Sequence, residues 1–271
     1  MELTAISWNL FHGRDFPPDP ALRTWRSRLL RVTERNETHV QVNRNLLPEF
    51  CRLLAGAEWD VALLQECPPH WWKPLADACG AEAHGVLTSR NSLSSVRTLA
   101  ARANPDLIAS GEGGSNLTLA RSGGIVERRE LTVHSGRPER RAMAFTRTGP
   151  GFCVANLHAT NDRPDLATED VLRAAEAASE WAGDGPLIFG GDLNLRPQES
   201  PGVFAELGER FGLAAPTAPD AIDHILARGL VVVEAPHQWP LEWRELDEDG
   251  LALRLSDHAP VEARFALPTS R

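Results

Sequence analysis

Short apolar runs recur from one end of the chain to the other, and they constrain the fold more than any other feature. Each run is continuous or alternates with polar residues, as strands do, and each is bounded by turn residues. The runs occupy residues 3–8, 61–65, 116–120, 152–158, 187–189, 222–226 and 260–267. A chain with strands along its whole length must bury extensive sheet surface, so we expect a β-rich core.

Helical patterns lie between some of these runs. Apolar residues recur at helical spacing over residues 166–181, with Pro164 near the start and Gly183 just beyond the end. A second apolar stripe over residues 46–54 ends at Gly56 and should cover a sheet face. The mixture predicts a layered α/β architecture. Because no linker or internal repeat is visible, we interpret residues 1–271 as a single domain.

Two features of the composition bear on location. The strand-like residues 3–8 follow Met1 almost at once and leave no room for a secretory signal, and no apolar run reaches the roughly 18 residues of a membrane span. Cys51, Cys67, Cys79 and Cys153 lie far apart and form no CxxC pair. We therefore expect a cytoplasmic protein with reduced thiols.

Several strand ends finish in residues that bind metals or transfer protons, and an α/β scaffold usually gathers its site at strand ends. These residues are Asn9, Glu66, His158, Asp192, Asn194, Asp223, Asp257 and His258. Hard cations such as Mg²⁺ prefer carboxylate and amide oxygens. Glu66, Asp257 and Asn9 fit that preference.

In order and local wording, the motifs WN, QE, NLH, GDLN, IDHI and SDHAPV resemble those of the endonuclease/exonuclease/phosphatase superfamily, over residues 7–265. The resemblance implies a deoxyribonuclease-like fold, in which a two-sheet β-sandwich is flanked by helices in four α/β/β/α layers. It also implies a phosphoric ester hydrolase that depends on Mg²⁺ or Mn²⁺.

The resemblance further implies a role for each motif residue in the metal site. Glu66 would be the principal metal ligand, supported by Asn9 and Asp257. Asp192 and Asn194 would orient the attacking water or hold a second metal ion.

Two histidines would perform the proton transfers. The resemblance implies that His258, steered by Asp223, is one catalytic histidine, and that His158 contacts or protonates the phosphate. A neutral imidazole titrates near physiological pH, and a carboxylate on its other nitrogen fixes the tautomer and stabilises the imidazolium. Asp223 and His258 are therefore expected to form a dyad.

The substrate is less constrained than the chemistry. A nuclease, with DNA ahead of RNA, is the leading hypothesis, and a phosphatase or phosphodiesterase acting on a small soluble metabolite or lipid head group is the alternative. The net charge of -9 favours the alternative slightly, because phosphate contacts come mainly from Lys and Arg. The sequence shows no convincing membrane-docking element and indicates no protein partner. A non-catalytic binding module would have lost Glu66, Asp192, Asp257 or His258, and all four are present.

Further residues admit two interpretations. A basic cluster after the first strand is either a solvated helix face or a clamp on a nucleic-acid backbone. It consists of Arg23, Arg26, Arg28, Arg31 and Arg35. Trp71 and Trp72 fit packing better than base stacking, and strand alternation should turn His224 away from Asp223. Arg121 and Asn116 match family positions loosely and would approach the substrate from the rim or serve structure.

Overall fold

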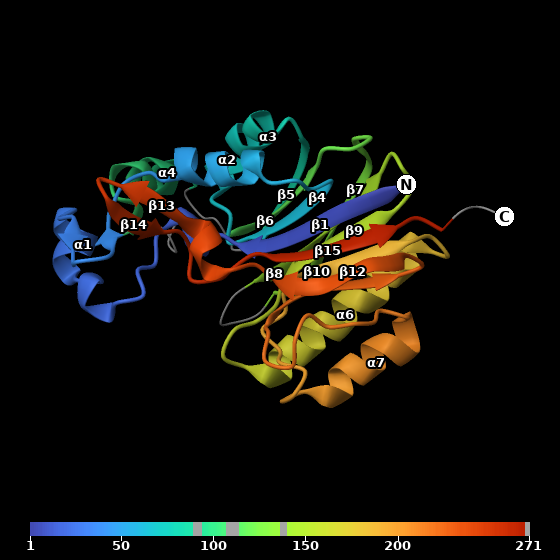
Figure 1. The fold of residues 1–271 in the computed structure, drawn as a ribbon. Helices are drawn as coiled ribbons and strands as arrows, with labels where there is room; N and C mark the ends of the chain where they lie inside the picture. Colours follow the sequence, from blue (N-terminus) through green and yellow to red (C-terminus); the bar gives the residue numbers. More distant parts are fainter. Residues whose placement is uncertain (89–93, 107–113, 136–139, 269–271) are drawn as a thin grey trace.

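Two β-sheets packed face to face form the centre of the protein, and helices lie on their outer faces (Figure 1). The computed structural model describes residues 1–88, 94–106, 114–135 and 140–268. The layers are the α/β/β/α arrangement of the deoxyribonuclease-like fold, which confirms the expected fold class.

The first sheet has six strands in the order β12-β15-β1-β4-β6-β5. Its strands are β1 Glu2–Asn9, β4 Val61–Gln65, β5 Glu82–Leu87, β6 Ser115–Ala120, β12 Val231–Gln238 and β15 Val261–Ala266. Within it β1 and β4 are parallel, with Asn9 opposite Gln65, and the other pairs are antiparallel. The carboxyl ends of β1 and β4 therefore lie side by side at the same end of the sheet.

The second sheet has five strands in the order β11-β10-β9-β8-β7. Its strands are β7 Ile125–His134, β8 Arg141–Thr148, β9 Cys153–His158, β10 Leu187–Asp192 and β11 Asp223–Arg228. Here β9 and β10 are parallel, with His158 opposite Asp192, and β11 runs antiparallel to β10 with Asp223 opposite Asp192. The register alone brings three predicted site residues side by side.

Helices cover the outer face of each sheet. On the side of the six-stranded sheet lie α2 Leu47–Gly56, α3 Trp72–Cys79 and α4 Ser94–Ala103 (Figure 1). On the side of the five-stranded sheet lie α6 Pro164–Ala182 and α7 Pro201–Phe211. The remaining elements gather beyond the end of β1 that carries Asn9. They are α1 Trp25–Leu30, β2 Glu34–Arg35, β3 Val40–Gln41, β13 Glu245–Glu248 and β14 Leu251–Arg254.

Strand alternation produces the layered core. In β1, Leu3 and Ala5 face the second sheet, where they pack with residues such as Phe152, whereas Ile6 and Trp8 face the helices of the first sheet. Separate apolar clusters thus lie between the sheets and under each helical layer.

Two sequence predictions concern the chain as a whole, namely reduced cysteines and the lack of a membrane-spanning segment. All four cysteines are free thiols, as expected. Among the helices of the described residues, none is long and apolar enough to cross a membrane.

Candidate active site

Two glycines allow the strands of the second sheet to pack closely at the site. A Cβ on Gly190 would lie 2.3 Å from the carbonyl oxygen of His224, and one on Gly191 would lie 1.9 Å from that of Leu157. Gly191 also has a φ of 128°, which L side chains rarely adopt. The two glycines that precede Asp192 therefore serve close strand packing, and β10 continues through them to Asp192 instead of ending at Phe189 as the sequence indicated.

Asn9 connects the two sheets at this end of the sandwich. Its Nδ2 donates to Oδ2 of Asp192 at 2.9 Å, and its Oδ1 accepts the backbone N–H of Phe11 at 2.9 Å. Behind it, the buried amide of Gln65 donates to Oδ1 of Asn156 on β9 at 2.8 Å. These bonds fix the first sheet against the second and position the carboxylate of Asp192.

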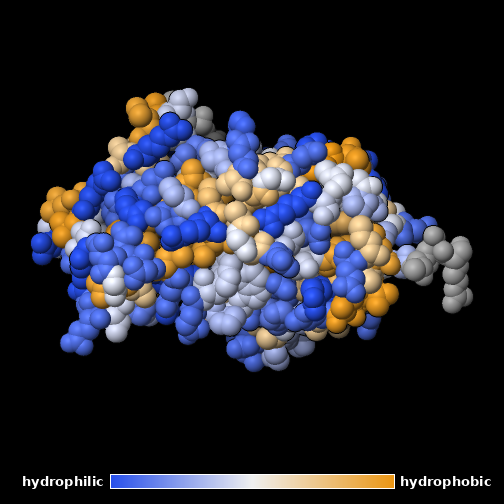
Figure 2. Space-filling view, turned by 45° about the horizontal axis from the view of Figure 1, so that its top comes forward, coloured by the Kyte–Doolittle hydropathy of each residue, from blue (hydrophilic) through white to orange (hydrophobic). Residues whose placement is uncertain are grey.

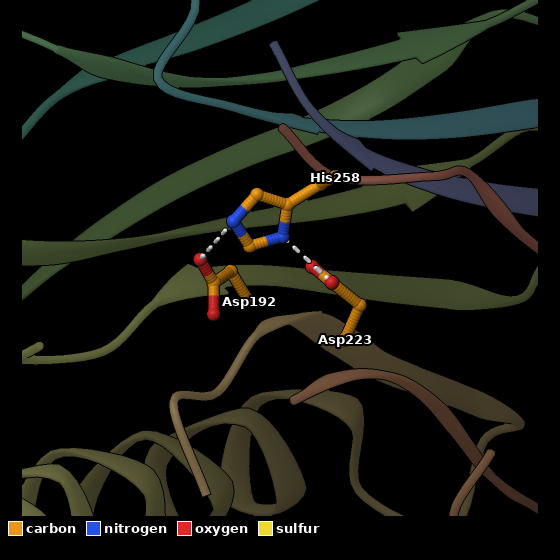
Figure 3. Close-up of side chains that lie close together, drawn as sticks. All are labelled: Asp192, Asp223 and His258. Atoms are coloured by element: carbon orange, nitrogen blue, oxygen red, sulfur yellow. Dashed lines mark hydrogen bonds and ion pairs between the residues drawn. The ribbon is translucent and has the colours of Figure 1, made fainter. Parts of the chain in front are cut away.

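His258 lies between two carboxylates contributed by β10 and β11 (Figure 3). Its Nδ1 is 2.8 Å from Oδ2 of Asp223, and its Nε2 is 3.9 Å from Oδ2 of Asp192. Nε2 also lies 3.8 Å from Oδ1 of Asp257. Burial lowers the pKa of His258, but the charges of Asp223, Asp192 and Asp257 outweigh burial and hold that pKa well above its usual value.

The backbone around His258 is anchored to the first strand. Its N–H donates to Oγ of Ser256 at 3.1 Å, and that hydroxyl donates to the carbonyl of Asn9 at 2.6 Å. The indole of Trp8 donates to the carbonyl of His258 at 2.9 Å. A cleft of about 430 Å³ opens beside the imidazole and is lined in part by Asp223, Gln238 and Asp257. The side chain is thus held in one orientation at the wall of a cleft.

His158 approaches the same carboxylate from the other side. Its Nε2 lies 3.5 Å from Oδ2 of Asp192 and 3.9 Å from Oε1 of Glu66. Burial, followed by the positive charges of Arg141 and His258, lowers the pKa of His158 well below its usual value. The two histidines therefore differ in environment, because burial disfavours a charge on His158 whereas three carboxylates favour one on His258.

Glu66 and Asp257 are the two carboxylates that the sequence analysis expected to bind a metal ion. Glu66 follows β4 with a φ of 49°, and about a fifth of its side chain is exposed. Burial and then the negative charge of Glu66 raise the pKa of Asp257, although His258 lowers it. Two carboxylates that repel each other at a partly open site suit a divalent cation, and carboxylate and amide oxygens are the donors that Mg²⁺ and Mn²⁺ prefer. Glu66, Asp257 and Asn9 fit such an ion.

Asp192 and Asn194 occupy the loop at the end of β10. Asp192 is almost fully buried, and burial together with the neighbouring Asp223 raises its pKa. The backbone N–H of Asn194 donates to Oδ1 of Asp192 at 3.2 Å, whereas the amide of Asn194 donates to the carbonyl of Ala159 at 3.0 Å. One donor atom from each of Asp192, Asp223 and His258 lies within 4.8 Å of the others, so these residues form a second group able to hold a metal.

Two further residues, which belong to none of the motifs, also lie at the site. Phe11, His12 and Gly13 all have positive φ, and this tight turn places Nε2 of His12 3.1 Å from Oε2 of Glu66. Arg14 follows the turn, and the charges of Glu66 and Asp257 act on its guanidinium. The signal available in the sequence was the position of His12 and Arg14, within five residues of the strand-end residue Asn9.

Other residues with a proposed link to the substrate have structural roles. Arg121 stacks on Trp59 and donates to backbone carbonyls at the end of α2, and its N–H donates to Asp60 at the start of β4. It is therefore at the opposite end of the sheet from Glu66, and the idea that it approaches the substrate is wrong. Asn116 is fully buried and donates to the carbonyl of Ala142.

The packing interpretations of the tryptophans and of His224 agree with the structure. Trp71 is buried in the core beneath α2, and the indole of Trp72 donates to Oγ of Ser115. His224 is fully buried, its Nε2 lies 3.1 Å from the carbonyl of Leu195, and its ring packs against Phe204.

The five arginines of the basic cluster are all exposed, on or beside α1. Nε of Arg31 donates to the carbonyl of Asn43, and Arg35 pairs with Asp249. Figure 2 shows hydrophobic and strongly hydrophilic side chains next to each other at the end of the molecule that carries α1, where Leu29 and Leu30 are exposed. The cluster therefore combines structural contacts with an exposed cationic surface.

Comparisons with known proteins place this site in a family context. Residues 6–258 match the family model described as the Endonuclease/Exonuclease/phosphatase family. A family protein of that description from Bacteroides thetaiotaomicron is 18% identical, with 100% of this chain and 97% of that chain covered and a TM-score of 0.66. A mannosyl-6-phosphatase from the same species is 17% identical over 98% of this chain and all of that chain, with a TM-score of 0.62.

A third structure, TDP2 from C. elegans, is 13% identical, with 98% of this chain and 75% of that chain covered and a TM-score of 0.59. No curated protein matches the sequence. At these identities the structural likenesses establish the fold.

Proposed function

Because the chain belongs to the endonuclease/exonuclease/phosphatase family, it is a phosphoric ester hydrolase, and we propose that His258 and Asp223 activate the water that attacks phosphorus. The observation that carries the proposal is the distance of 2.8 Å between Nδ1 of His258 and Oδ2 of Asp223, which leaves Nε2 facing Asp192. A carboxylate at Nδ1 keeps the proton on that nitrogen and leaves Nε2 able to accept one.

Each buried group then has a task in the reaction. Nε2 of His258 takes a proton from water, and the resulting imidazolium is stabilised by Asp223. Asp192, held by Asn9 and by the N–H of Asn194, accepts the other hydrogen of that water. His158, whose pKa burial lowers, would contact a phosphoryl oxygen from the opposite side.

Glu66, Asp257 and Asn9 would hold the divalent cation. When bound there, such an ion would supply a Lewis acid for the phosphoryl oxygens and for the alkoxide that leaves. His12, 3.1 Å from Glu66, orients this carboxylate toward the site.

Two substrate classes follow from different observations. A small phosphorylated metabolite is favoured by the net charge of -9 and by a cleft of about 430 Å³ beside His258, within the range of small-molecule pockets of about 300–1,000 Å³. The fold shared with a mannosyl-6-phosphatase is compatible with such a substrate. A nuclease, with DNA ahead of RNA, is the second candidate, favoured by the exposed arginines on α1.

A single set of assays tests the function and separates the substrates. The purified protein is assayed with Mg²⁺, with Mn²⁺ and with EDTA on plasmid DNA, RNA, bis-p-nitrophenyl phosphate and a panel of phosphorylated metabolites. We expect metal-dependent turnover of at least one small ester, which falls by orders of magnitude in His258→Ala. Nicking or degradation of polymer without turnover of metabolites would favour the nuclease, and inactivity on every ester with both metals would refute the proposal.

A further inference from the structure

Helix α1 exposes three large apolar side chains to solvent. Trp25 is 65% exposed, Leu29 is 52% exposed and Leu30 is 61% exposed. Trp25 and Leu29 are four residues apart and therefore lie on the same face of the helix, with Leu30 next to Leu29 in the chain. Large apolar side chains that are gathered on one exposed element, instead of scattered singly, mark an interaction surface.

Exposed arginines accompany these apolar side chains. Residues 20–33 include four arginines and no Asp or Glu, in a protein whose net charge is -9. Arg26 and Arg28 are exposed on the helix itself. Among the five arginines of the basic cluster, only Arg35 pairs with a carboxylate of the described residues, that of Asp249. This part of an acidic protein is therefore cationic, and we use the name α1 surface for Trp25, Arg26, Arg28, Leu29 and Leu30.

The inner side of this segment is fixed to the rest of the protein. Ser27 is buried, and the amide of Asn43 donates to the carbonyls of Ser27 at 2.9 Å and of Arg28 at 3.1 Å. The hydroxyl of Thr24 accepts the N–H of Ser27 where the helix begins, and Nε of Arg31 donates to the carbonyl of Asn43 just beyond its end. A partner would therefore meet a preformed surface, which avoids the entropy cost of ordering a loop.

The charge of the α1 surface distinguishes between possible occupants. A second copy of the chain that packed on the same surface would set arginine against arginine, and like charges across an interface oppose binding. An anionic partner would instead be attracted by these side chains. The occupant is therefore expected to carry negative charge.

The apolar side chains distinguish between anionic partners. The phosphate backbone of a nucleic acid would pair with the arginines but would give Leu29 and Leu30 no apolar surface, and bases stack on aromatic rings. An anionic bilayer suits both kinds of side chain, because apolar groups enter the boundary between head groups and acyl chains while basic groups stay among the head groups. Tryptophan is enriched at that boundary. The combination therefore favours a membrane surface.

We propose that the α1 surface docks the protein reversibly on a membrane that contains anionic lipids. The sequence alone shows no convincing docking element, because it does not reveal that Leu29 and Leu30 are exposed. Three apolar side chains on a helix of six residues support reversible docking and not stable anchoring. Because α1 lies beyond the end of β1 that carries Asn9, docking would bring the active-site end of the molecule toward the membrane (Figure 1).

Cosedimentation of the full chain with vesicles tests the proposal. Vesicles of phosphatidylcholine alone are compared with vesicles that also contain about 30% phosphatidylserine, in NaCl of about 50 mM and about 500 mM. We expect the anionic vesicles to bind at least tenfold more tightly than the neutral ones, and this binding to weaken at the higher salt. No binding to the anionic vesicles, or equal binding to both kinds, would overturn the proposal.

Two double variants then assign the binding to the α1 surface. Arg26→Gln with Arg28→Gln should weaken binding to the anionic vesicles about 25-fold, at about fivefold for each basic side chain near an anionic membrane. Leu29→Gln with Leu30→Gln keeps the charge of the surface and should weaken binding about tenfold or more, because less apolar area enters the bilayer. All four side chains are exposed, so both variants should keep the circular dichroism spectrum of the wild type.

Matched controls make the same changes elsewhere on the molecule. Val231→Gln with Val232→Gln replaces two apolar side chains that are 57% and 47% exposed on β12. Arg163→Gln with Arg210→Gln removes two exposed arginines on the side of α6 and α7. Both controls should bind the anionic vesicles as the wild type does. A control that lost as much binding as the matching α1 variant would overturn the assignment to α1.

The pattern of losses separates a membrane from other anionic partners. If the arginine variant loses vesicle binding and the leucine variant does not, the surface is a general anion site and the proposal is overturned. A fluorescent DNA duplex is titrated in parallel, and DNA binding by a protein that does not bind the vesicles would identify nucleic acid as the occupant. These readouts do not require turnover, so they hold whether or not the proposed function does.

Discussion

Nδ1 of His258 lies 2.8 Å from Oδ2 of Asp223, although 35 residues separate them in the chain. His258 follows the end of the small β13–β14 hairpin, whereas Asp223 opens β11. The pairing places the proposed general base and the carboxylate proposed to orient it at the wall of a cleft that is also lined by Asp257.

We predict that Asp223→Asn abolishes most activity without unfolding the protein. The amide cannot stabilise the imidazolium, and it allows the wrong tautomer of His258, a change that costs about 10⁴-fold in a serine-protease triad. We expect turnover of bis-p-nitrophenyl phosphate to fall by about 10²- to 10⁴-fold, with an unchanged circular dichroism spectrum. Asp184→Asn, at an exposed loop position, is the control. Turnover of Asp223→Asn within threefold of the wild type would exclude the dyad.

Gly191→Ala should destabilise the protein, since the added Cβ would lie 1.9 Å from the carbonyl oxygen of Leu157 at a φ of 128°. We expect the free energy of unfolding to fall by more than about 2 kcal/mol in urea denaturation. Gly202→Ala is the matched control, because a Cβ there meets nothing within 4 Å and the residue lies in α7. Equal stability of the two variants would show that β9 and β10 do not need this close approach.

His84 should make stability depend on pH. Burial, followed by the charge of Arg128, lowers its pKa to about 4, and Nδ1 lies 2.9 Å from Oγ1 of Thr146. In the unfolded chain the pKa is about 6.5. The unfolded state therefore binds the proton first, so the contribution of His84 is full above pH 6.5 and is lost as pH falls toward 4, up to about 3 kcal/mol.

Urea denaturation between pH 7.5 and pH 4.5 measures this effect. His84→Gln, which cannot titrate, should lose less stability than the wild type over that range. His237→Gln, at an exposed position, should follow the wild-type curve. Parallel curves for His84→Gln and the wild type would show that His84 is not buried in its neutral form.

The nuclease candidate predicts a role for the arginines on α1. Replacing Arg26, Arg28 and Arg31 by Gln should reduce the slope of log affinity for DNA against log salt by up to about 2.7, at about 0.9 for each phosphate that these side chains neutralise. Replacement of Arg163 and Arg210, which lie on the side of α6 and α7, is the control. An unchanged slope of log affinity against log salt, measured by fluorescence anisotropy, would refute the hypothesis that these arginines clamp nucleic acid.

Much of the fold could be predicted because the core strands are buried and therefore apolar. The expected strand over residues 61–65 coincides with β4, in which every residue is buried, and the apolar stripe expected to be helical over residues 166–181 lies within α6. By contrast, β7 lies at the edge of its sheet and most of its residues are not buried, so pairing with β8 defines it. β12 is also an edge strand, with Val231 57% exposed. Exposure does not explain every outcome, because β11 is also an edge strand and was predicted, whereas the buried strand β8 was not.

The residues of the candidate site also include some that the sequence predicted and others that it did not. Asn9, Asp192, Asp223 and His258 belong to recognisable motifs, and the structure brings them together within hydrogen-bond or ion-pair distance. His12 was missed, because its closeness to Asn9 in sequence gives no direction, and only the turn of left-handed residues brings it back toward the site. Motif order predicts which strand ends meet, but the path of a connecting turn depends on backbone conformation.

We propose that Glu66 and Asp257 hold one divalent cation beside His258. Anomalous diffraction from a crystal soaked in Mn²⁺ tests it directly. We predict a peak with carboxylate oxygens of both Glu66 and Asp257 within about 2.3 Å, the range for coordination by hard oxygen ligands. A Mn²⁺ ion held only by Asp192, Asp223 and His258, with Glu66 and Asp257 outside its coordination shell, would contradict the claim.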